Sequence, residues 1–239
     1  GGPLRRSQAI ARGGRLSYNP PMREMISIAI ETSCRVGGLA LGRGDRLART
    51  VTFDASSRHA THLVGRLRDL LRDEGLTVDD LGQAYVAAGP GSFTGLRVGI
   101  TVARTMGQLL PSLRLVGVPT TLAVAQNARA LAWEHLAVVL DAREGLIYAE
   151  RFVRRGEEIA PAAGPEVLTP AEFLAAAPRP LLAIGEGLGY RDLRADGVAL
   201  APQDLWLPTP EGVWRVGRRL AAAGGFVDFN HLLPTYTRP

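Results

Sequence analysis

A glycine-rich segment in the middle of the chain constrains its fold more than any other feature. Residues 89–99, GPGSFTGLRVG, follow a short apolar run at 84–88 that is typical of a strand, and they open an apolar stretch to residue 110 that is typical of a helix. Such a turn lets the backbone come close to whatever lies above it and points the free N–H groups of the helix at that object. The segment therefore predicts an α/β unit whose loop meets a phosphate, a partner protein or the chain itself.

Two familiar phosphate-binding loops are excluded by these residues. A P-loop needs a lysine that reaches the phosphates, and the chain contains no lysine. The dinucleotide fingerprint needs G-x-G-x-x-G, whereas the third glycine here, Gly95, comes one place late. Ser92 or Thr94 is expected to cap the helix, so a simple capped turn and an anion-binding turn both stay open.

The positive charge of the chain is concentrated near its start. The first 24 residues hold five of the 28 basic residues and one of the 23 acidic ones, which leaves 23 against 22 in the rest. We expect residues 1–24 to be a disordered basic leader or an added extension. The nearly neutral remainder argues against direct binding of a nucleic acid by the body of the chain, which stays a rival hypothesis.

The single cysteine, Cys34, excludes an internal disulfide and favours a reducing compartment. No apolar run in the sequence is long enough to cross a membrane. We therefore expect a cytoplasmic protein without a membrane partner.

Two hairpins of one design indicate a duplicated lobe. Glu31 and Asp141 each stand at the tip of the first strand of a hairpin. Apolar periodicity predicts strands at 26–30, 37–41, 47–53, 84–88, 113–118, 136–140, 146–152 and 181–184, and helices after Ser56 or Ser57, at 95–110, after Thr120 or Thr121, from Thr169, and at 211–223.

This order of elements predicts an α/β fold of the actin-like/Hsp70/sugar-kinase (ASKHA) architecture, with two ribonuclease-H-like lobes, the second reduced. We place the N-terminal lobe at 25–110 and the C-terminal lobe at 111–239, with a tail that returns to the N-terminal lobe. In this architecture two hairpin turns hold the phosphates of a nucleotide and a late glycine turn holds its adenosine. The candidate nucleotide-binding residues are accordingly Glu31, Ser33, Asp141, Arg143, Gly185 and Gly187.

Four segments together resemble the bacterial TsaB family. They are residues 28–33 (IAIETS), residues 89–97 (GPGSFTGLR), Asp141-Ala142-Arg143 with Tyr148, and residues 234–238 (PTYTR). The resemblance implies a non-catalytic scaffold subunit in the threonylcarbamoylation of the tRNA adenosine next to the anticodon. It also implies a TsaD-type transferase and a TsaE-type ATPase as partners, a homodimer when the chain is alone, and only indirect contact with tRNA.

The sequence gives little support for a metal site or for a nucleotide-hydrolysing site. TsaD-like proteins hold their metal with a His-x-x-x-His pair, and none of the four histidines has that spacing. His59 and His62 could share a helix face, but a metal site needs three or four ligands. Glu31 is one carbon longer than the aspartate of the kinases, which would displace a tightly placed ion. We expect no cofactor and no catalytic residue. Weak binding of ATP or ADP, at an interface with a partner, stays open, and an active ATPase or small-molecule kinase is the alternative function.

The helix at 95–110 is apolar on more than one side, with one polar stripe formed by Arg97, Thr101, Arg104, Thr105 and Gln108. Its glycines, Gly95 and Gly99, allow another backbone to approach closely, either within the lobe or from a partner. Because the resembled family associates through this helix and the preceding one, the predicted partner interface is His59, His62, Arg66, Gly95, Leu96 and Gly99.

Overall fold

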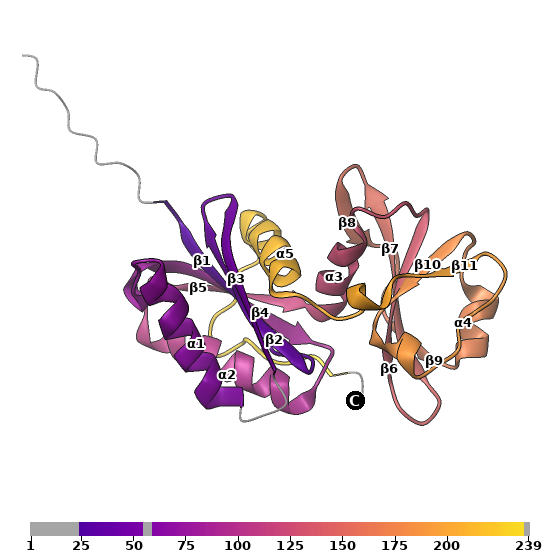
Figure 1. Ribbon diagram of the computed structural model, residues 1–239, viewed down its shortest axis with the longest axis horizontal. Coiled ribbons are helices and arrows are strands. Elements are labelled where there is room, and N and C mark those ends of the chain that lie inside the picture. Colours follow the sequence, from indigo (N-terminus) through magenta and orange to yellow (C-terminus); the bar gives the residue numbers. More distant parts are fainter. Residues whose placement is uncertain (1–23, 55–58, 237–239) are drawn as a thin grey trace, which may run out of the picture.

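The computed structural model describes residues 24–54 and 59–236, without the side chains of residues 59–62. Two β-sheets lie side by side, each with helices on its faces (Figure 1). The first sheet has the strand order β3-β2-β1-β4-β5. Its strands are β1 (Ile26–Glu31), β2 (Val36–Arg43), β3 (Arg46–Asp54), β4 (Leu81–Gly89) and β5 (Arg114–Pro119).

The second sheet repeats the first. Its order is β11-β10-β6-β7-β8, with β9 on the same side of β7 as β8. In both sheets the first three strands in sequence are antiparallel neighbours, and two later strands, β4 and β5 in the first sheet and β10 and β11 in the second, are added in parallel on the side of the first strand. The strands are β6 (His135–Asp141), β7 (Ile147–Arg155), β8 (Glu158–Pro161), β9 (Glu166–Leu168), β10 (Leu181–Ile184) and β11 (Val198–Leu200). The predicted duplication is confirmed.

Helices divide the molecule into layers. One face of the first sheet packs on α1 (His59–Asp73) and α2 (Phe93–Leu109), and the core of that layer includes Ile28, Ile30 and Leu63. The opposite face packs on α5 (Pro210–Ala222), which lies with α3 (Thr120–Ala125) between the two sheets. The far side of the second sheet carries only the short α4 (Pro170–Ala176). Because both faces of β1 are covered, all six of its residues are buried.

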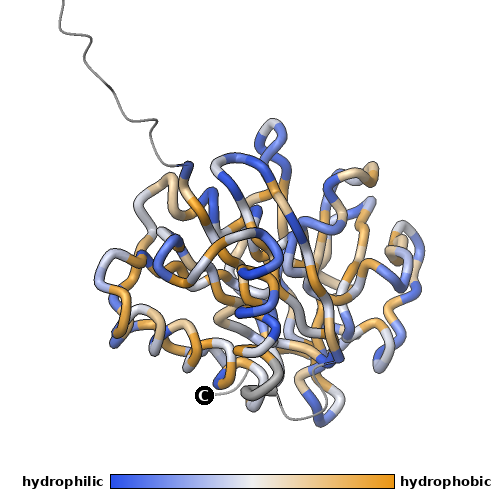
Figure 2. The backbone as a smooth tube through the Cα atoms, turned by 60° about the vertical axis from the view of Figure 1, so that its left-hand side comes forward, coloured by the Kyte–Doolittle hydropathy of each residue, from blue (hydrophilic) through white to orange (hydrophobic). Residues whose placement is uncertain are grey.

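Short 3-10 turns complete the described elements. They are η1 (Val78–Asp80), η2 (Gln126–Ala128), η3 (Glu186–Gly189) and η4 (Gln203–Leu205). In the first lobe the long helix α2 lies between β4 and β5. In the second lobe the short turn η3 takes the corresponding place between β10 and β11. The second lobe is therefore the reduced one. Figure 2 shows the hydrophobic stretches running through the strands and the hydrophilic ones in the outer loops.

Local sequence signals explain where the helices begin and end. Ser92 caps α2, and its Oγ accepts a hydrogen bond from the Gly95 N–H. Thr169 and Glu172 form a capping box at the start of α4, ahead of a proline in its first turn. Gly75 follows α1 with a φ of 68°, in the region that glycine adopts freely. The predicted cap at Ser56 or Ser57 lies outside the described residues.

The boundary between the lobes comes later than the sequence indicated. We expected the first lobe to end at residue 110, but β5 pairs in parallel with β4 and completes the first sheet. The C-terminal segment also belongs to this lobe. The Trp214 indole of α5 donates to Ser27 Oγ of β1 at 3.0 Å, and the Thr235 N–H donates to the Ala88 carbonyl. The first lobe is thus built from both ends of the described chain.

Candidate functional site

The glycine segment is engaged by its own lobe. The Ser92 N–H donates to the Ser33 carbonyl at 2.7 Å, and Thr32 Oγ1 donates to the Gly95 carbonyl at 2.9 Å. A Cβ atom at Gly95 would overlap the carbonyl oxygen of Thr32, and one at Gly99 would overlap the Thr32 hydroxyl. The glycines therefore serve the close approach of α2 to the turn after β1.

This packing corrects part of the predicted partner interface. Gly95, Leu96 and Gly99 are buried within the first lobe, so a partner has no access to them. Gly95 and Gly99 predicted the close approach of another segment correctly, but that segment is the turn at Thr32 of the same chain. Arg66 is exposed on α1, whereas the side chains of His59 and His62 lie outside the described residues.

Glu31 lies at the carboxyl end of β1 and is completely buried. Its Oε1 accepts hydrogen bonds from the backbone N–H of Ser33 and from Ser33 Oγ, the latter at 2.6 Å. Its Oε2 has no hydrogen-bond partner among the described residues. Burial raises the pKa of this carboxyl to about 7, against the lowering effect of the Ser33 hydrogen bonds. Ser33 therefore satisfies one oxygen of Glu31 inside the lobe and leaves the other without a hydrogen-bond partner among the described residues.

Asp141 occupies the corresponding position at the end of β6. Its Oδ1 lies 2.9 Å from Arg191 Nη2, and its backbone N–H points at Glu186 Oε1 at 3.4 Å. Burial raises the pKa of Glu186, and the neighbouring Asp141 carboxylate adds to that rise. Sequence reasoning missed Glu186 and Arg191. The only signal for either was the position of Glu186 inside the predicted glycine turn.

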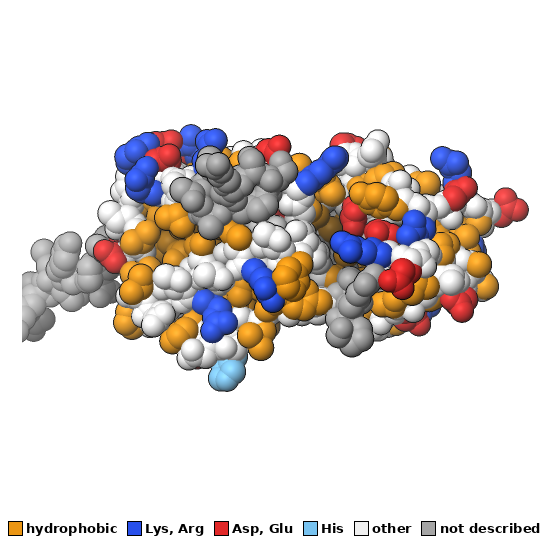
Figure 3. Space-filling model, turned by 90° about the horizontal axis from the view of Figure 1, so that it is seen from below, with side chains coloured by type: hydrophobic (Ala, Val, Ile, Leu, Met, Phe, Trp, Pro, Cys, Tyr) orange, Lys and Arg blue, Asp and Glu red, His pale blue; other side chains and the backbone are white. Residues whose placement is uncertain are grey.

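The carboxyl ends of β1 and β6 come near each other where the two lobes meet, and we call this junction the cleft. Cys34, just after the Glu31 turn, has its pKa raised to about 12, first by burial, then by the charge of Glu31, with a smaller contribution from Glu186 of the other lobe. Carboxyl groups of both lobes therefore act on Cys34. In the view from below, acidic and basic side chains gather around a hollow in the second lobe (Figure 3).

The other predicted nucleotide-binding residues do not form an open cradle. A Cβ atom at Gly185 would overlap the Val139 carbonyl, and Gly187 packs closely on the backbone of Leu140. Because these glycines have no side chain, η3 can pack closely against the backbone of β6. Arg143 is exposed in the turn after Asp141, with a φ of 63°. The six predicted residues come from both lobes, and five of them, all but Arg143, make side-chain bonds or close packing contacts within their own lobe.

The arrangement does not fit a magnesium nucleotide as the fold class would bind it. Such a ligand needs oxygen atoms free to bind the ion and a cationic or N–H-rich surface for the phosphates. Here Glu31 is enclosed, Asp141 is paired with Arg191, and the N–H of Ser92 is used within the lobe. In the part of the chain that the structure describes, no group of three His, Cys, Asp or Glu residues could hold a metal ion.

A second surface is formed by α1, α2 and the C-terminal tail. Three large apolar side chains are exposed on it, Val64, Phe93 and Leu109, the last with 72 % of its surface accessible. The Phe93 ring lies 3.8 Å below the Arg97 guanidinium and 5.3 Å from the Tyr236 ring. Helix α2 contains no acidic residue. We call these exposed parts of α1 and α2, with Tyr236, the α1–α2 face; Figure 3 shows hydrophobic and uncharged side chains with a few basic ones on this lobe.

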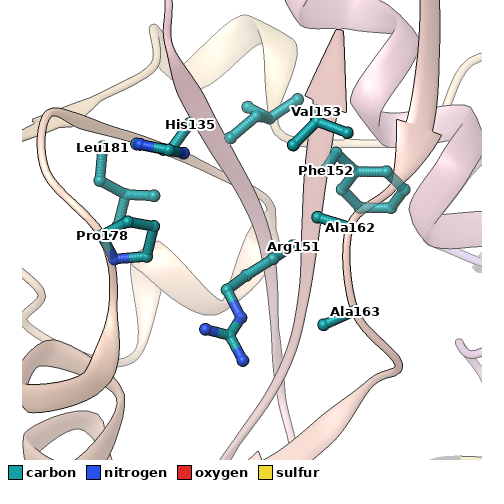
Figure 4. Close-up of a pocket in the computed structure, with 9 residues that line it drawn as sticks. His135, Arg151, Phe152, Val153, Ala162, Ala163, Pro178 and Leu181 are labelled. Carbon is teal, nitrogen blue, oxygen red and sulfur yellow. The ribbon is translucent and has the colours of Figure 1, made fainter. Parts of the chain in front are cut away.

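A small hollow lies at the opposite end of the second sheet (Figure 4). It has a volume of about 160 Å³ and includes His135, Arg151, Pro178 and Leu181 among its walls. The short α4 leaves this end of the sheet uncovered. Arg151 in its wall is already paired with Glu166, at 3.1 Å, so the guanidinium charge is balanced within the lobe.

The repeated sheets, with a cleft between the carboxyl ends of β1 and β6, define an actin-like, ASKHA-type protein. The family described as TsaD, tRNA N6-adenosine threonylcarbamoyltransferase, matches residues 52–193. Similar proteins are the "tRNA threonylcarbamoyladenosine biosynthesis protein TsaB" of Escherichia coli, 27% identical over 88% of this chain and 94% of its own length, and its Bacillus subtilis namesake, 27% identical over 90% and 94%.

Solved structures agree with these sequences. A Pseudomonas aeruginosa protein described as similar to the peptidase YEAZ superposes with a TM-score of 0.77 and 26% identity, over 90% of this chain and 100% of that one. YeaZ from the same organism gives 0.75 and 25%, over 89% and 99%. The chain belongs to the TsaD family. Its similarity to the two curated relatives and to the YeaZ structures supports membership of the TsaB family. Among the described residues, no helix is long and apolar enough to cross a membrane.

Proposed function

We propose that the chain is a non-catalytic scaffold subunit that binds a TsaD-type transferase, together with a TsaE-type ATPase, in the threonylcarbamoylation of the tRNA adenosine next to the anticodon. Its TsaB relatives are named for the biosynthesis of this nucleoside. The observation that carries the proposal is the α1–α2 face, where two helices that pack on each other leave Val64, Phe93 and Leu109 exposed, with Phe93 and Leu109 at opposite ends of α2. Large apolar side chains exposed along two packed helices favour burial against another protein.

The chemistry of the face indicates its partner. Arg97 and Arg104 lie on α2, and the helix carries no opposing carboxylate. A complementary surface would therefore be apolar with acidic residues at its rim. We propose that the same face mediates the homodimer, so the two assemblies compete. The chain has no resident cofactor in this proposal, and ATP or ADP binds weakly, at the interface of the complex. The site of action is the cytoplasm, where tRNA is modified.

Complex formation tests the proposal directly. The TsaD-type transferase of the same organism is titrated with the wild-type chain and with Phe93→Ser and Leu109→Ser, by calorimetry. Each substitution should weaken binding at least about tenfold, because it removes an apolar side chain from the interface. Val167→Ser is the matched control, since Val167 is also an exposed apolar residue but lies on β9 of the other lobe. Equal affinities for all four chains would refute this use of the face.

The alternative, an ATPase or small-molecule kinase, is disfavoured by the enclosed Glu31 and the paired Asp141. It makes a different prediction. The isolated chain would turn over ATP with magnesium at ordinary enzyme rates, about 1 to 1000 per second. Turnover at that level, abolished by Asp141→Asn, would replace the scaffold proposal with the enzymatic one.

A further inference from the structure

Arg191 and Asp141 form a contact that closes the second-lobe side of the cleft. Asp141 ends β6, and Arg191 follows η3 after one intervening residue, Tyr190. Their side chains are only 22% and 24% exposed, and Oδ1 and Nη2 are 2.9 Å apart. Arg191 Nη1 also donates to the Tyr190 carbonyl at 2.9 Å, which fixes the guanidinium to its own loop. Asp141 Oδ1 has no hydrogen-bond partner among the described residues, so its contact with Arg191 is a close charge pair, and the bond to the Tyr190 carbonyl is what holds the guanidinium.

The surroundings give this cation a specific task. Glu186 accepts a hydrogen bond from the Asp141 backbone N–H. The charge of the Asp141 side chain disfavours ionisation of Glu186. Across the cleft, Glu31 is completely buried with an unpartnered Oε2. The Asp141 side chain is only 22% exposed, and partly buried negative charge is costly unless a positive charge lies nearby. Arg191 supplies it at Asp141.

We propose that Arg191 is an internal counter-ion that occupies the position beside Asp141 and Glu186 where a divalent cation would otherwise bind. A guanidinium and a divalent cation both balance carboxylate charge, but the guanidinium is tethered and always protonated. It therefore excludes a free cation, and with it a metal-bound phosphate, from the second-lobe half of the cleft. The inference concerns this cleft alone and does not depend on the proposed scaffold function.

Removing the tethered cation should expose a metal site that the wild-type chain lacks. The probe is Mn²⁺ alone, followed by electron paramagnetic resonance of the free ion and by relaxation enhancement of solvent protons. Arg191→Ser should bind Mn²⁺ at least about tenfold more tightly than the wild-type chain, through the oxygen atoms of Asp141 and Glu186. Arg194→Ser is the matched control, because Arg194 is an exposed residue of the same loop. It should behave as wild type.

Two further variants make the outcome decisive. Arg191→Lys keeps a positive charge and should not gain Mn²⁺ affinity, which separates charge from loop disturbance. The double variant Arg191→Ser/Asp141→Asn should lose the affinity gained by Arg191→Ser. Circular dichroism and thermal unfolding establish that each variant is folded. Should Arg191→Ser destroy the fold, Arg191→Gln, which keeps most of the side-chain volume, takes its place. The proposal is overturned if wild type and the folded neutral variant bind Mn²⁺ equally, or if Asp141→Asn leaves the gained affinity intact.

Discussion

The hydroxyl of Thr32 donates to the carbonyl of Gly95 across 63 residues of sequence, at 2.9 Å. This bond joins the turn after β1 to the first turn of α2 and leaves no room for a side chain at Gly95. It explains why the glycine segment faces its own lobe rather than a ligand. The two segments are two of the four that resemble the TsaB family, and in the structure they contact each other directly.

Gly95→Ala is expected to destabilise the protein by about 2 to 4 kcal/mol, because the new Cβ meets the rigid backbone of Thr32. Gly65→Ala is the matched control. Gly65 lies within α1, and a Cβ atom there meets nothing within 4 Å, so this variant should gain about 0.5 to 1 kcal/mol from helix propensity. Urea unfolding of both variants measures the difference. Equal stabilities would contradict the packing described for Thr32.

The pH dependence of stability should carry the signature of Glu31. Its pKa is raised from 4.5 to about 7 in the folded protein, so the folded state holds a proton that the unfolded state has lost between these values. The stability present below pH 4.5 is therefore lost as the pH rises through 7, by about 3 kcal/mol from this group. The rise in the pKa values of Glu150 and Glu186 acts in the same direction.

Glu31→Gln removes the titrating group and keeps an oxygen that can accept from Ser33. Its unfolding free energy, measured in urea from pH 4.5 to 8, should fall less steeply than that of the wild-type chain. Glu172→Gln is a suitable comparison, because Glu172 is exposed and its pKa is lowered instead by hydrogen bonds from Thr169. Parallel curves for wild type and Glu31→Gln would show that burial does not control this carboxyl.

The C-terminal helix should be essential to the stability of the first lobe. The Trp214 indole is buried against β1 and donates to Ser27. Trp214→Ala should therefore cost about 3 to 5 kcal/mol, while Trp214→Phe, which loses mainly the hydrogen bond, should cost about 1 to 2. Chemical unfolding measures both. A small effect of Trp214→Ala would mean that α5 contributes little to the packing of the first sheet.

Charge on the α1–α2 face should matter for association. Arg97→Glu introduces a carboxylate beside Phe93 and Tyr236, and we expect it to weaken binding to the TsaD-type transferase about tenfold, more at low salt than at high salt. Arg194→Glu makes the same charge change on the other lobe and should leave the affinity unchanged. Affinities measured at two salt concentrations decide between an electrostatic and a purely apolar face.

Much of the fold follows from local sequence signals. The caps Ser92 and Thr169 and the apolar runs of both hairpins each act within a few residues, so they predict their elements correctly. The strands β8, β9 and β11 were not predicted, because each has only three or four residues and depends on pairing with a longer neighbour.

The candidate site was harder to predict for a different reason. Glu31 and Asp141 stand at the strand ends that the sequence indicated, since a hairpin fixes where its first strand stops. Their partners are set by tertiary structure instead. Arg191 lies 50 positions from Asp141, and no periodic pattern connects them. Likewise, the small residues of α2 reveal that something packs closely on it, but not whether that neighbour is Thr32 or another protein.

The most direct test of the scaffold proposal is the transfer reaction itself. A TsaD-type transferase and a TsaE-type ATPase are combined with tRNA and the other components of the transfer reaction, with and without this chain, and threonylcarbamoyladenosine is quantified in the tRNA. The proposal predicts that modification requires the wild-type chain, persists with Asp141→Asn, and falls sharply with Phe93→Ser. Full modification in the absence of the chain would contradict it.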